Sequence, residues 1–217
     1  MKHAVLFDCD GVLVNSEDGL SKIAAFVLNK YYIIPALPED FAPYIGTGED
    51  TYIGEVVRKY GKTFTQDMKK KIYEEYNVLA QQYVPPMEGS KDLVRKLRGE
   101  GFKVALASSA DAAKVDINMK ILDMEYTDFD AVITGSDVAK KKPDPDIYLI
   151  AAKRCGVSPA DCIVVEDATS GVLSGKRAGM KVIGITSSVL DKVLISYGAD
   201  CTVATFKELD EVIHGTE

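Results

Sequence analysis

Six short and almost wholly apolar runs recur along the chain, and they constrain its fold more than any other feature. They are Ala4–Phe7, Val104–Ala107, Ala131–Thr134, Cys162–Val165, Lys181–Ile185 and Cys201–Val203. Strands that are covered on both faces of a parallel sheet are apolar throughout, whereas strands with one solvated face alternate. Helical patterns stand between the runs, and this succession is typical of a parallel sheet flanked by helices. We therefore predict an α/β fold whose core is a Rossmann-like, doubly wound parallel sheet.

Start and stop signals mark several of the helices between the runs. Ser90 is predicted to cap one helix. Asp144, followed by proline, is predicted to cap a second helix, which Gly156 closes. Thr205 and Glu208 have the spacing of a capping box before the last helix.

The interval between Asn15 and Tyr83 departs from this succession, because it contains helical patterns and no strand-like run. Two sets of apolar residues in it recur at helical spacing. The first set is Leu20, Ile23, Ala24, Val27, Leu28 and Tyr31, and the second is Met68, Ile72, Tyr76, Leu79 and Tyr83. We predict an all-helical subdomain, residues 15–84, inserted into a discontinuous α/β core of residues 1–14 and 85–217.

The composition is that of a globular protein, with 47% hydrophobic and 27% charged residues among 217. The net charge of −7 argues against nucleic-acid binding, which favours basic surfaces. No run reaches the roughly 20 apolar residues of a membrane helix, and no secretory signal pattern begins the chain. The four cysteines are too widely spaced for a zinc or redox motif, which fits a reducing compartment. We expect a cytoplasmic monomer that binds neither nucleic acid nor membranes.

Two carboxylates, Asp8 and Asp10, stand where the first apolar run ends. Ligands in open parallel sheets bind outside the carboxyl ends of the strands, so this pair is well placed for chemistry. A simpler interpretation is that the two acids end the strand and begin a turn at Gly11. The motif alone leaves both interpretations open.

Polar residues at the other strand ends favour the chemical interpretation. Ser108 and Ser109 follow the second run, and Glu166 and Asp167 follow the fourth. Lys142 lies between these two motifs, just before a predicted helix. Each motif by itself could be a turn, a helix cap or a solvated loop. Their occurrence in order at successive strand ends indicates one shared site.

These residue types suit phosphoryl transfer. Magnesium prefers oxygen ligands, and Asp8, Asp167 and the backbone carbonyl of Asp10 could supply them beside water and a phosphate. Lys142 and Ser108 would orient and neutralise the phosphoryl oxygens. An aspartate can accept a phosphoryl group, and a second acid can move the proton of the leaving oxygen. We expect the proximity of like charges to raise one pKa and to favour that second role.

Four motifs, in order, resemble those of the haloacid dehalogenase superfamily of phosphohydrolases. FDCDGVLVNSE resembles the family's first motif, DxDGxLxDS, and ALASSA, KKKPDPDIY and VVEDATSGVLSGKRAGM resemble the second, third and fourth. The resemblance extends along the whole chain. The inserted helical segment is similar to the cap of the branch that contains beta-phosphoglucomutase and many small-metabolite phosphatases.

The resemblance implies a role for each matching residue. Asp8 would be the nucleophile, forming an aspartyl-phosphate, and Asp10 the general acid/base. Ser108, Ser109 and Lys142 would bind phosphate.

The resemblance also implies a Mg²⁺ cofactor. Asp8, Asp167 and the Asp10 carbonyl would bind the ion, and Glu166 would reach it directly or through water. In the fourth motif, small residues would let the following helix lie close to the sheet. These are Gly171, Gly175 and Ala178.

Three positions depart from the family pattern. Asn15 replaces the aspartate that usually ends the first motif, at the hinge into the cap. Leu20 and Gly48 stand where beta-phosphoglucomutase has a cap histidine and an arginine. A mutase must hold a second phosphate in its cap, so these replacements favour a phosphatase. The glycine-rich loop Gly46–Asp50 could gate the site or could be only a turn before a helix.

We therefore predict Mg²⁺-dependent hydrolysis of a small phosphorylated metabolite, a phosphomonoester. A phosphosugar mutase of the beta-phosphoglucomutase type is the alternative. A dehalogenase would need no metal, so Asp10 and the pair Glu166 and Asp167 count against it. A receiver-type signalling module would lack the helical insertion.

Overall fold

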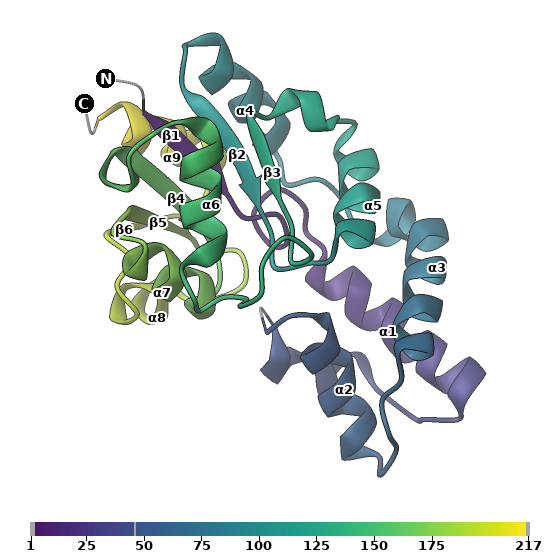
Figure 1. Cartoon of the computed structure of the whole chain (residues 1–217). Coiled ribbons are helices and arrows are strands. Elements are labelled where there is room, and N and C mark those ends of the chain that lie inside the picture. The colour runs from purple at the N-terminus through teal and green to yellow at the C-terminus, as the bar shows by residue number, and fades with distance from the viewer. Residues whose placement is uncertain (1–2, 46, 216–217) are drawn as a thin grey trace.

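The computed structural model describes residues 3–45 and 47–215, and its centre is a parallel sheet (Figure 1). Within the described residues the sheet has six strands in the order β3-β2-β1-β4-β5-β6. The strands are β1 Ala4–Phe7, β2 Lys103–Ala107, β3 Ala131–Ile133, β4 Cys162–Glu166, β5 Lys181–Ile185 and β6 Cys201–Val203. All five strand pairs are parallel, so the predicted doubly wound α/β fold is confirmed. After β1 the chain continues to β2 on one side of β1, and after β3 it crosses to β4 on the other side. Open parallel sheets bind ligands at such a reversal of strand order.

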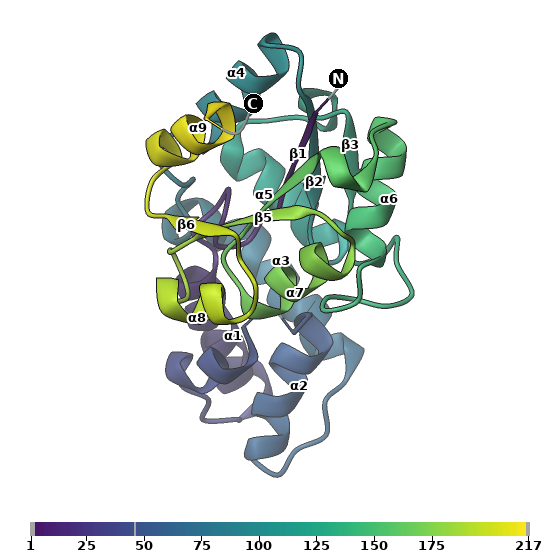
Figure 2. The ribbon, with the colours of Figure 1, turned by 90° about the vertical axis from the view of Figure 1, so that its left-hand side faces the viewer.

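Helices cover both faces of the sheet. The helices after β1 are α1 Glu17–Tyr32, α2 Glu49–Lys59, α3 Gln66–Tyr83, α4 Ser90–Gly99, α5 Ala112–Leu122, α6 Asp146–Cys155, α7 Thr169–Arg177, α8 Asp191–Ser196 and α9 Phe206–His214. Short 3₁₀ turns are η1 Pro38–Tyr44, η2 Tyr126–Asp128 and η3 Pro159–Asp161. Figure 2 shows α9 and α6 on opposite sides of the sheet.

The strands β1 to β5 contribute side chains to two separate cores, one on each face of the sheet, whereas the edge strand β6 contributes to one of them. Val5 and Phe7 of β1 join the cluster under α4, α5 and α9, while Ala4 and Leu6 join the cluster under α6, α7 and α8. Successive side chains of a strand point to opposite faces, so both faces need apolar residues here. This arrangement explains why the runs show no polar alternation.

The helices α1, α2 and α3, with η1, pack on one another below the sheet, as Figure 1 shows. We call residues 17–83 the helical segment. Within the described part of residues 15–83 no strand of the sheet occurs, as expected. The chain enters and leaves this segment side by side, since the Asn15 amide donates to the Pro85 carbonyl at 2.9 Å. In the described part of the chain, no helix is long and apolar enough to span a lipid bilayer.

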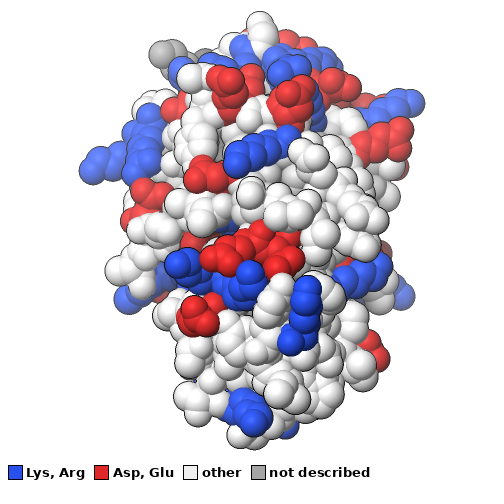
Figure 3. Space-filling view, turned by 90° about the vertical axis from the view of Figure 1, so that its right-hand side faces the viewer, with Lys and Arg blue, Asp and Glu red and all other residues white. Residues whose placement is uncertain are grey.

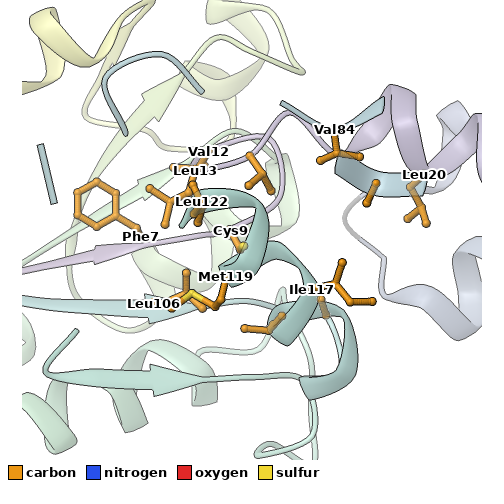
Figure 4. Packing of buried hydrophobic residues seen from close by; sticks show 14 of the residues in the cluster. Phe7, Cys9, Val12, Leu13, Leu20, Val84, Leu106, Ile117, Met119 and Leu122 are labelled. Atoms are coloured by element: carbon orange, nitrogen blue, oxygen red, sulfur yellow. The ribbon is translucent and has the colours of Figure 1, made fainter. Parts of the chain in front are cut away.

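A continuous apolar cluster joins the sheet to the helical segment. Figure 4 shows it passing from Phe7 and Leu106 on the strands, through Met119 on α5, to Leu20 on α1 and Val84. All of these side chains are at most 5% exposed. The orientation of the helical segment near the sheet therefore rests in part on buried apolar contact.

Two predicted helix caps are wrong in detail. Gly89, with φ 81°, precedes α4 as its N-cap, and the Ser90 hydroxyl donates to the Leu13 carbonyl at 3.1 Å. Ser90 is therefore held by a neighbouring loop and cannot turn back to cap its own helix. The second helix begins at Asp146 with Pro145 as its N-cap, one residue after the predicted cap Asp144.

The other helix-end predictions are confirmed. Gly156 ends α6 in the left-handed conformation. Thr205 caps α9, where its hydroxyl oxygen accepts from the Glu208 amide at 3.2 Å. The Glu208 carboxylate reaches one residue further back than in a standard box, to the Ala204 amide at 2.8 Å.

Gly175 lies where α7 crosses the sheet, and it offers a test of the packing. A Cβ at this position would lie 2.7 Å from Cγ2 of Val182 and 3.3 Å from Cβ of Val164. Gly175→Ala is expected to lower the free energy of unfolding by about 1–3 kcal/mol through overpacking. Gly99→Ala is the matched control, because nothing lies within 4 Å of its added Cβ. Urea unfolding midpoints measure both, and equal stability of the two variants would contradict the close contact.

Candidate active site

The carboxyl ends of β1, β2 and β4 meet at one edge of the sheet, and the predicted site residues lie there. Asp8 follows β1, Ser108 follows β2, and Glu166 is the last residue of β4. Lys142 comes from the loop before α6, with its Nζ 2.5 Å from Asp8 Oδ1 and 2.6 Å from Glu166 Oε1. Since the same ammonium also donates to the Ala107 carbonyl of the second motif, the structure brings all four predicted motifs together around it.

The three consecutive lysines of the third motif have three different environments. The side chain of Lys140 is 70% exposed. Lys141 pairs with Asp111 at 3.1 Å. Lys142 is 7% exposed and also donates to the Ala107 carbonyl at 3.0 Å. Burial lowers the pKa of Lys142, but the two facing carboxylates outweigh it and the pKa is raised, so this lysine is a fixed cation.

Tyr148 of α6 was not foreseen from the sequence, and it completes the surroundings of Lys142. Its hydroxyl donates to Glu166 Oε1 at 2.6 Å, and its ring centre lies 4.8 Å from the Lys142 ammonium. The other Glu166 oxygen accepts from the amides of Asp167 and Ala168 at 3.2 and 3.3 Å. Glu166 therefore anchors Lys142 from a fully buried position.

Asp8, Glu166 and Asp167 form a compact group of carboxylates. Each offers one oxygen, and these three oxygens lie within 4.8 Å of one another. The turn at Gly11, with φ 73°, passes so close that a Cβ there would be 1.9 Å from Asp167 Oδ2. The Ser188 hydroxyl donates to that same oxygen. Both Glu166 oxygens accept hydrogen bonds from the protein, which hold this carboxylate in place beside Asp8 and Asp167.

The two acids of the first motif have opposite pKa shifts. Burial raises the pKa of Asp8 to about 7, with Lys142 acting against it and the charges of Glu166 and Asp10 adding to it. Burial also opposes the ionisation of Asp10, but a neighbouring ammonium and several hydrogen bonds outweigh burial and lower its pKa. Burial is thus the main cause of the raised pKa of Asp8, with a smaller contribution from like charges, and the expectation of a raised pKa for the acid/base residue is wrong for this arrangement.

The ammonium beside Asp10 belongs to Lys114 of α5, which was also missed from the sequence. Its Nζ lies 2.9 Å from Asp10 Oδ1, and the side chain is 5% exposed. The same oxygen accepts from Asn118 Nδ2 at 3.1 Å and from the Ser16 hydroxyl. Tyr76 of the helical segment donates in turn to Asn118 Oδ1 at 2.9 Å. Lys114 lies among helical residues without any motif, so the sequence carries no signal for it.

The predicted phosphate-binding serines border a small cavity. The Ser108 side chain is buried, and its oxygen accepts from the Ala110 amide at 3.1 Å. The buried Ser109 hydroxyl has no hydrogen-bond partner among the described residues, so it is available to a ligand. The cavity measures about 70 Å³. This is on the order of five times the 10–15 Å³ that one water needs, so the cavity has room for a small ligand.

The helical segment forms the opposite wall of the cavity. It contributes Tyr44, Ile45, Gly48, Glu49 and Tyr52. Gly48 is the N-cap of α2, so that end of the loop is a turn before a helix, while Gly46 lies outside the described residues. Leu20 is buried in the apolar cluster and does not border the cavity. Burial raises the pKa of Glu49, although Lys114 acts against the shift.

Ion pairs join the helical segment to the sheet beside the cavity. Lys69 of α3 lies 2.6 Å from Asp50 of α2 and 2.7 Å from Asp111, which also pairs with Lys141. Figure 3 shows charged side chains gathered in a band across the middle of the molecule, between the sheet above and the helical segment below. The ion pairs of Lys69 and Lys141 therefore join the helical segment to the sheet beside the site.

The chain belongs to the haloacid dehalogenase-like hydrolase family, whose sequence pattern it matches over residues 5–185. The superfamily suggested by the four motifs is thereby confirmed, and with it an enzyme of the hydrolase class. The crystal structure of a hydrolase from Pseudomonas syringae has the same fold, with a TM-score of 0.82 and 26% identity. The alignment covers 99% of this chain and 98% of that one.

Two relatives show the breadth of the family. Protein SUPPRESSOR OF QUENCHING 1, chloroplastic, of Arabidopsis thaliana is 38% identical over 201 residues. These residues are 90% of this chain but only 19% of that protein, so the chain spans about a fifth of its length. The phosphorylated carbohydrates phosphatase of Thermotoga maritima is 29% identical over 200 residues, which cover 91% of this chain and 92% of that protein.

Removal of the Lys142 ammonium tests its structural role. In metal-free buffer at pH 8, Lys142→Met is expected to lower the free energy of unfolding by about 3–5 kcal/mol, because the buried carboxylates of Asp8 and Glu166 lose their cation. The cost should shrink at pH 5, since Asp8, with its pKa raised to about 7, then carries a proton and needs no partner.

Lys140→Met is the matched control for this experiment. That side chain is exposed and lies 3.9 Å from Asp144, so the change should stay within about 0.5 kcal/mol. Urea unfolding at the two pH values measures both variants. A loss in Lys142→Met that equals the control would contradict the anchoring role.

Proposed function

We propose that the protein hydrolyses a small phosphomonoester in a Mg²⁺-dependent reaction, through an aspartyl-phosphate on Asp8. The observation that carries this proposal is the buried Lys142 ammonium in contact with Asp8, beside the group of three carboxylates. A carboxylate nucleophile, a fixed cation and a set of oxygen ligands are the parts that such phosphoryl transfer requires. We further propose that residues 15–84 act as a cap over a core of residues 1–14 and 85–217.

The acidic group fits a magnesium ion. Mg²⁺ takes oxygen ligands and is usually held by one or two carboxylates, waters and substrate phosphate. Asp8 and Asp167 would hold it with the Asp10 carbonyl, and Glu166 would act through water or through its hold on Lys142. When bound, the ion would offset the carboxylate charges and the charge of the phosphoryl oxygens.

The protein's own residues account for both chemical steps. In the first step, an Asp8 oxygen bonds to phosphorus, the ester P–O bond breaks, and the leaving oxygen takes a proton from Asp10. In the second step, a water oxygen bonds to phosphorus, its proton passes to Asp10, and the bond to Asp8 breaks to release phosphate. Lys142, Ser108 and Ser109 orient the phosphoryl oxygens throughout.

The first step requires Asp10 to carry a proton. In the described arrangement Lys114, Asn118 and Ser16 hold its carboxylate in the ionised form. The contact between Asp10 and Lys114 must therefore weaken when substrate enters, so that Asp10 turns to the leaving oxygen with a raised pKa.

The mutase alternative finds less support. A mutase must bind a second phosphate on the side of the helical segment. That wall presents the Glu49 carboxylate and the bare backbone of Gly48, and Leu20 lies away from the cavity.

A panel of phosphorylated metabolites tests the proposal. Purified protein with MgCl₂ is expected to release inorganic phosphate from at least one small phosphomonoester, and a chelator should abolish release. Isomerisation of beta-glucose 1-phosphate exceeding phosphate release would instead favour the mutase. Release of phosphate from no member of the panel would overturn the proposed function.

Asp8→Asn tests the nucleophile. The amide is isosteric but cannot attack phosphorus, so turnover should fall by about 10³-fold or more. The circular dichroism spectrum should remain that of the wild type. Asp144→Asn, which changes a half-exposed carboxylate outside the cavity, should keep full activity. Wild-type turnover in Asp8→Asn would rule out the assignment.

A further inference from the structure

Glu49, the first residue of α2, carries a buried carboxylate oxygen that the protein leaves without a partner. Glu49 is 5% exposed, and its Oε2 accepts no hydrogen bond from any described residue. Buried polar atoms are nearly always paired, because an unpaired one costs free energy that water would have supplied. Such an atom on the wall of a cavity is therefore available to a ligand.

The position of Glu49 shows which part of a substrate it would meet. It borders the same cavity as Asp8 and Asp10, but on the helical segment. The phosphate end of the cavity is defined by Lys142, on the sheet edge beside Asp8. Glu49 lies near Lys114, whose Nζ is 3.5 Å from Glu49 Oε1 and 2.9 Å from Asp10 Oδ1. It therefore faces the carbon framework of the leaving group rather than the phosphate.

The common structural role of such a residue does not explain Glu49. An acid in the first turn of a helix stabilises the positive end of the helix dipole. Asp50, in the same turn, can serve this purpose while its side chain stays 54% exposed. Stabilisation of the helix dipole therefore does not require the Glu49 side chain to be buried against the cavity.

The chemistry of the Glu49 and Lys114 pair selects one kind of group. A hydroxyl can donate to Glu49 Oε2 and accept from the Lys114 ammonium at the same time. A second phosphate or a carboxylate would face Glu49 with like charge, and an ammonium would face Lys114. An apolar group would leave Oε2 unpaired. Among these groups, the hydroxyl is the one that satisfies both partners.

We propose that Glu49 and Lys114 bind an uncharged hydroxyl of the leaving group, and that the substrate is the phosphomonoester of a small polyol or sugar. This inference rests on the proposed phosphatase function and adds the substrate class. It makes Glu49 a specificity residue, supplied by the helical segment to a reaction carried out at the sheet edge. The small cavity restricts the leaving group to a few carbon atoms in the described arrangement.

The test compares phosphate esters that differ in their leaving groups. With Mg²⁺, the wild type should hydrolyse glycerol 3-phosphate with a kcat/KM at least about tenfold above that of propyl phosphate, which lacks the hydroxyls. It should also prefer glycerol 3-phosphate to 3-phosphoglycerate, whose carboxylate would face Glu49. The aryl ester p-nitrophenyl phosphate reports the phosphatase reaction without any hydroxyl.

Glu49→Leu should reduce the ratio of kcat/KM for glycerol 3-phosphate over propyl phosphate to within about threefold of one. The ratio cancels any general loss of activity that the substitution causes. Glu49→Met, which keeps an unbranched side chain, is the second variant in case the leucine protein does not fold. Glu55→Leu is the matched control on the same helix, because Glu55 does not border the cavity and, among the described residues, pairs with Arg58 at the surface. It should keep the wild-type ratio.

The outcomes separate this inference from the proposed function. Hydrolysis of p-nitrophenyl phosphate with no preference for glycerol 3-phosphate would overturn the role of Glu49 and leave the phosphatase intact. A wild-type ratio in Glu49→Leu or Glu49→Met would do the same. Hydrolysis of no ester at all would overturn both proposals.

Discussion

The contact of the Lys142 ammonium with Asp8 and Glu166 is the interaction on which the site depends. It places one buried cation between carboxylates from two neighbouring strands, at the edge where the sheet binds ligands. A buried charge is tolerated only with a partner, so each of the three groups requires the others. The Tyr148 hydroxyl and the amides after Glu166 satisfy the remaining acceptors. Loop, strand and helix α6 are therefore held in one arrangement by this small set of contacts.

A second buried lysine divides the cavity into two chemically different halves. Lys142 forms an ion pair with Asp8, where a phosphoryl group would be transferred. Lys114 forms an ion pair with Asp10, where the leaving oxygen would be protonated. The pKa of Asp8 is raised and that of Asp10 lowered, because burial dominates at the first residue and the ammonium with its hydrogen bonds at the second. Both shifts describe the protein without a metal ion or substrate. The proposed reaction requires that their entry reverse this order, since a nucleophile must be ionised and an acid protonated.

The helical segment links the fold to the choice of substrate. The apolar cluster through Met119 and Leu20, together with the ion pairs of Lys69, holds the segment against the sheet. That contact carries Glu49 to the wall of the cavity and leaves its carboxylate facing the leaving-group side. In the proposed reaction the chemistry would take place at the strand ends, and the leaving group would be recognised by Glu49 of the helical segment together with Lys114 of α5. Because Lys114 lies beside both Asp10 and Glu49, it would link the two properties.

The sequence by itself determined the six strands and the motif residues at their ends, because buried parallel strands are apolar throughout and their carboxyl ends meet at one edge. Asp8, Ser108 and Lys142 could therefore be assigned to one site from the order of the motifs alone. Only the tertiary structure decided that Lys114, Tyr148 and Glu49 take part. Helical spacing assigns such residues to a helix but does not tell which distant carboxylate they will face. It also decided that Ser90 does not cap its own helix, since its contact with the Leu13 carbonyl outweighs the local preference of a single polar side chain, and that Pro145 rather than Asp144 is the N-cap of α6.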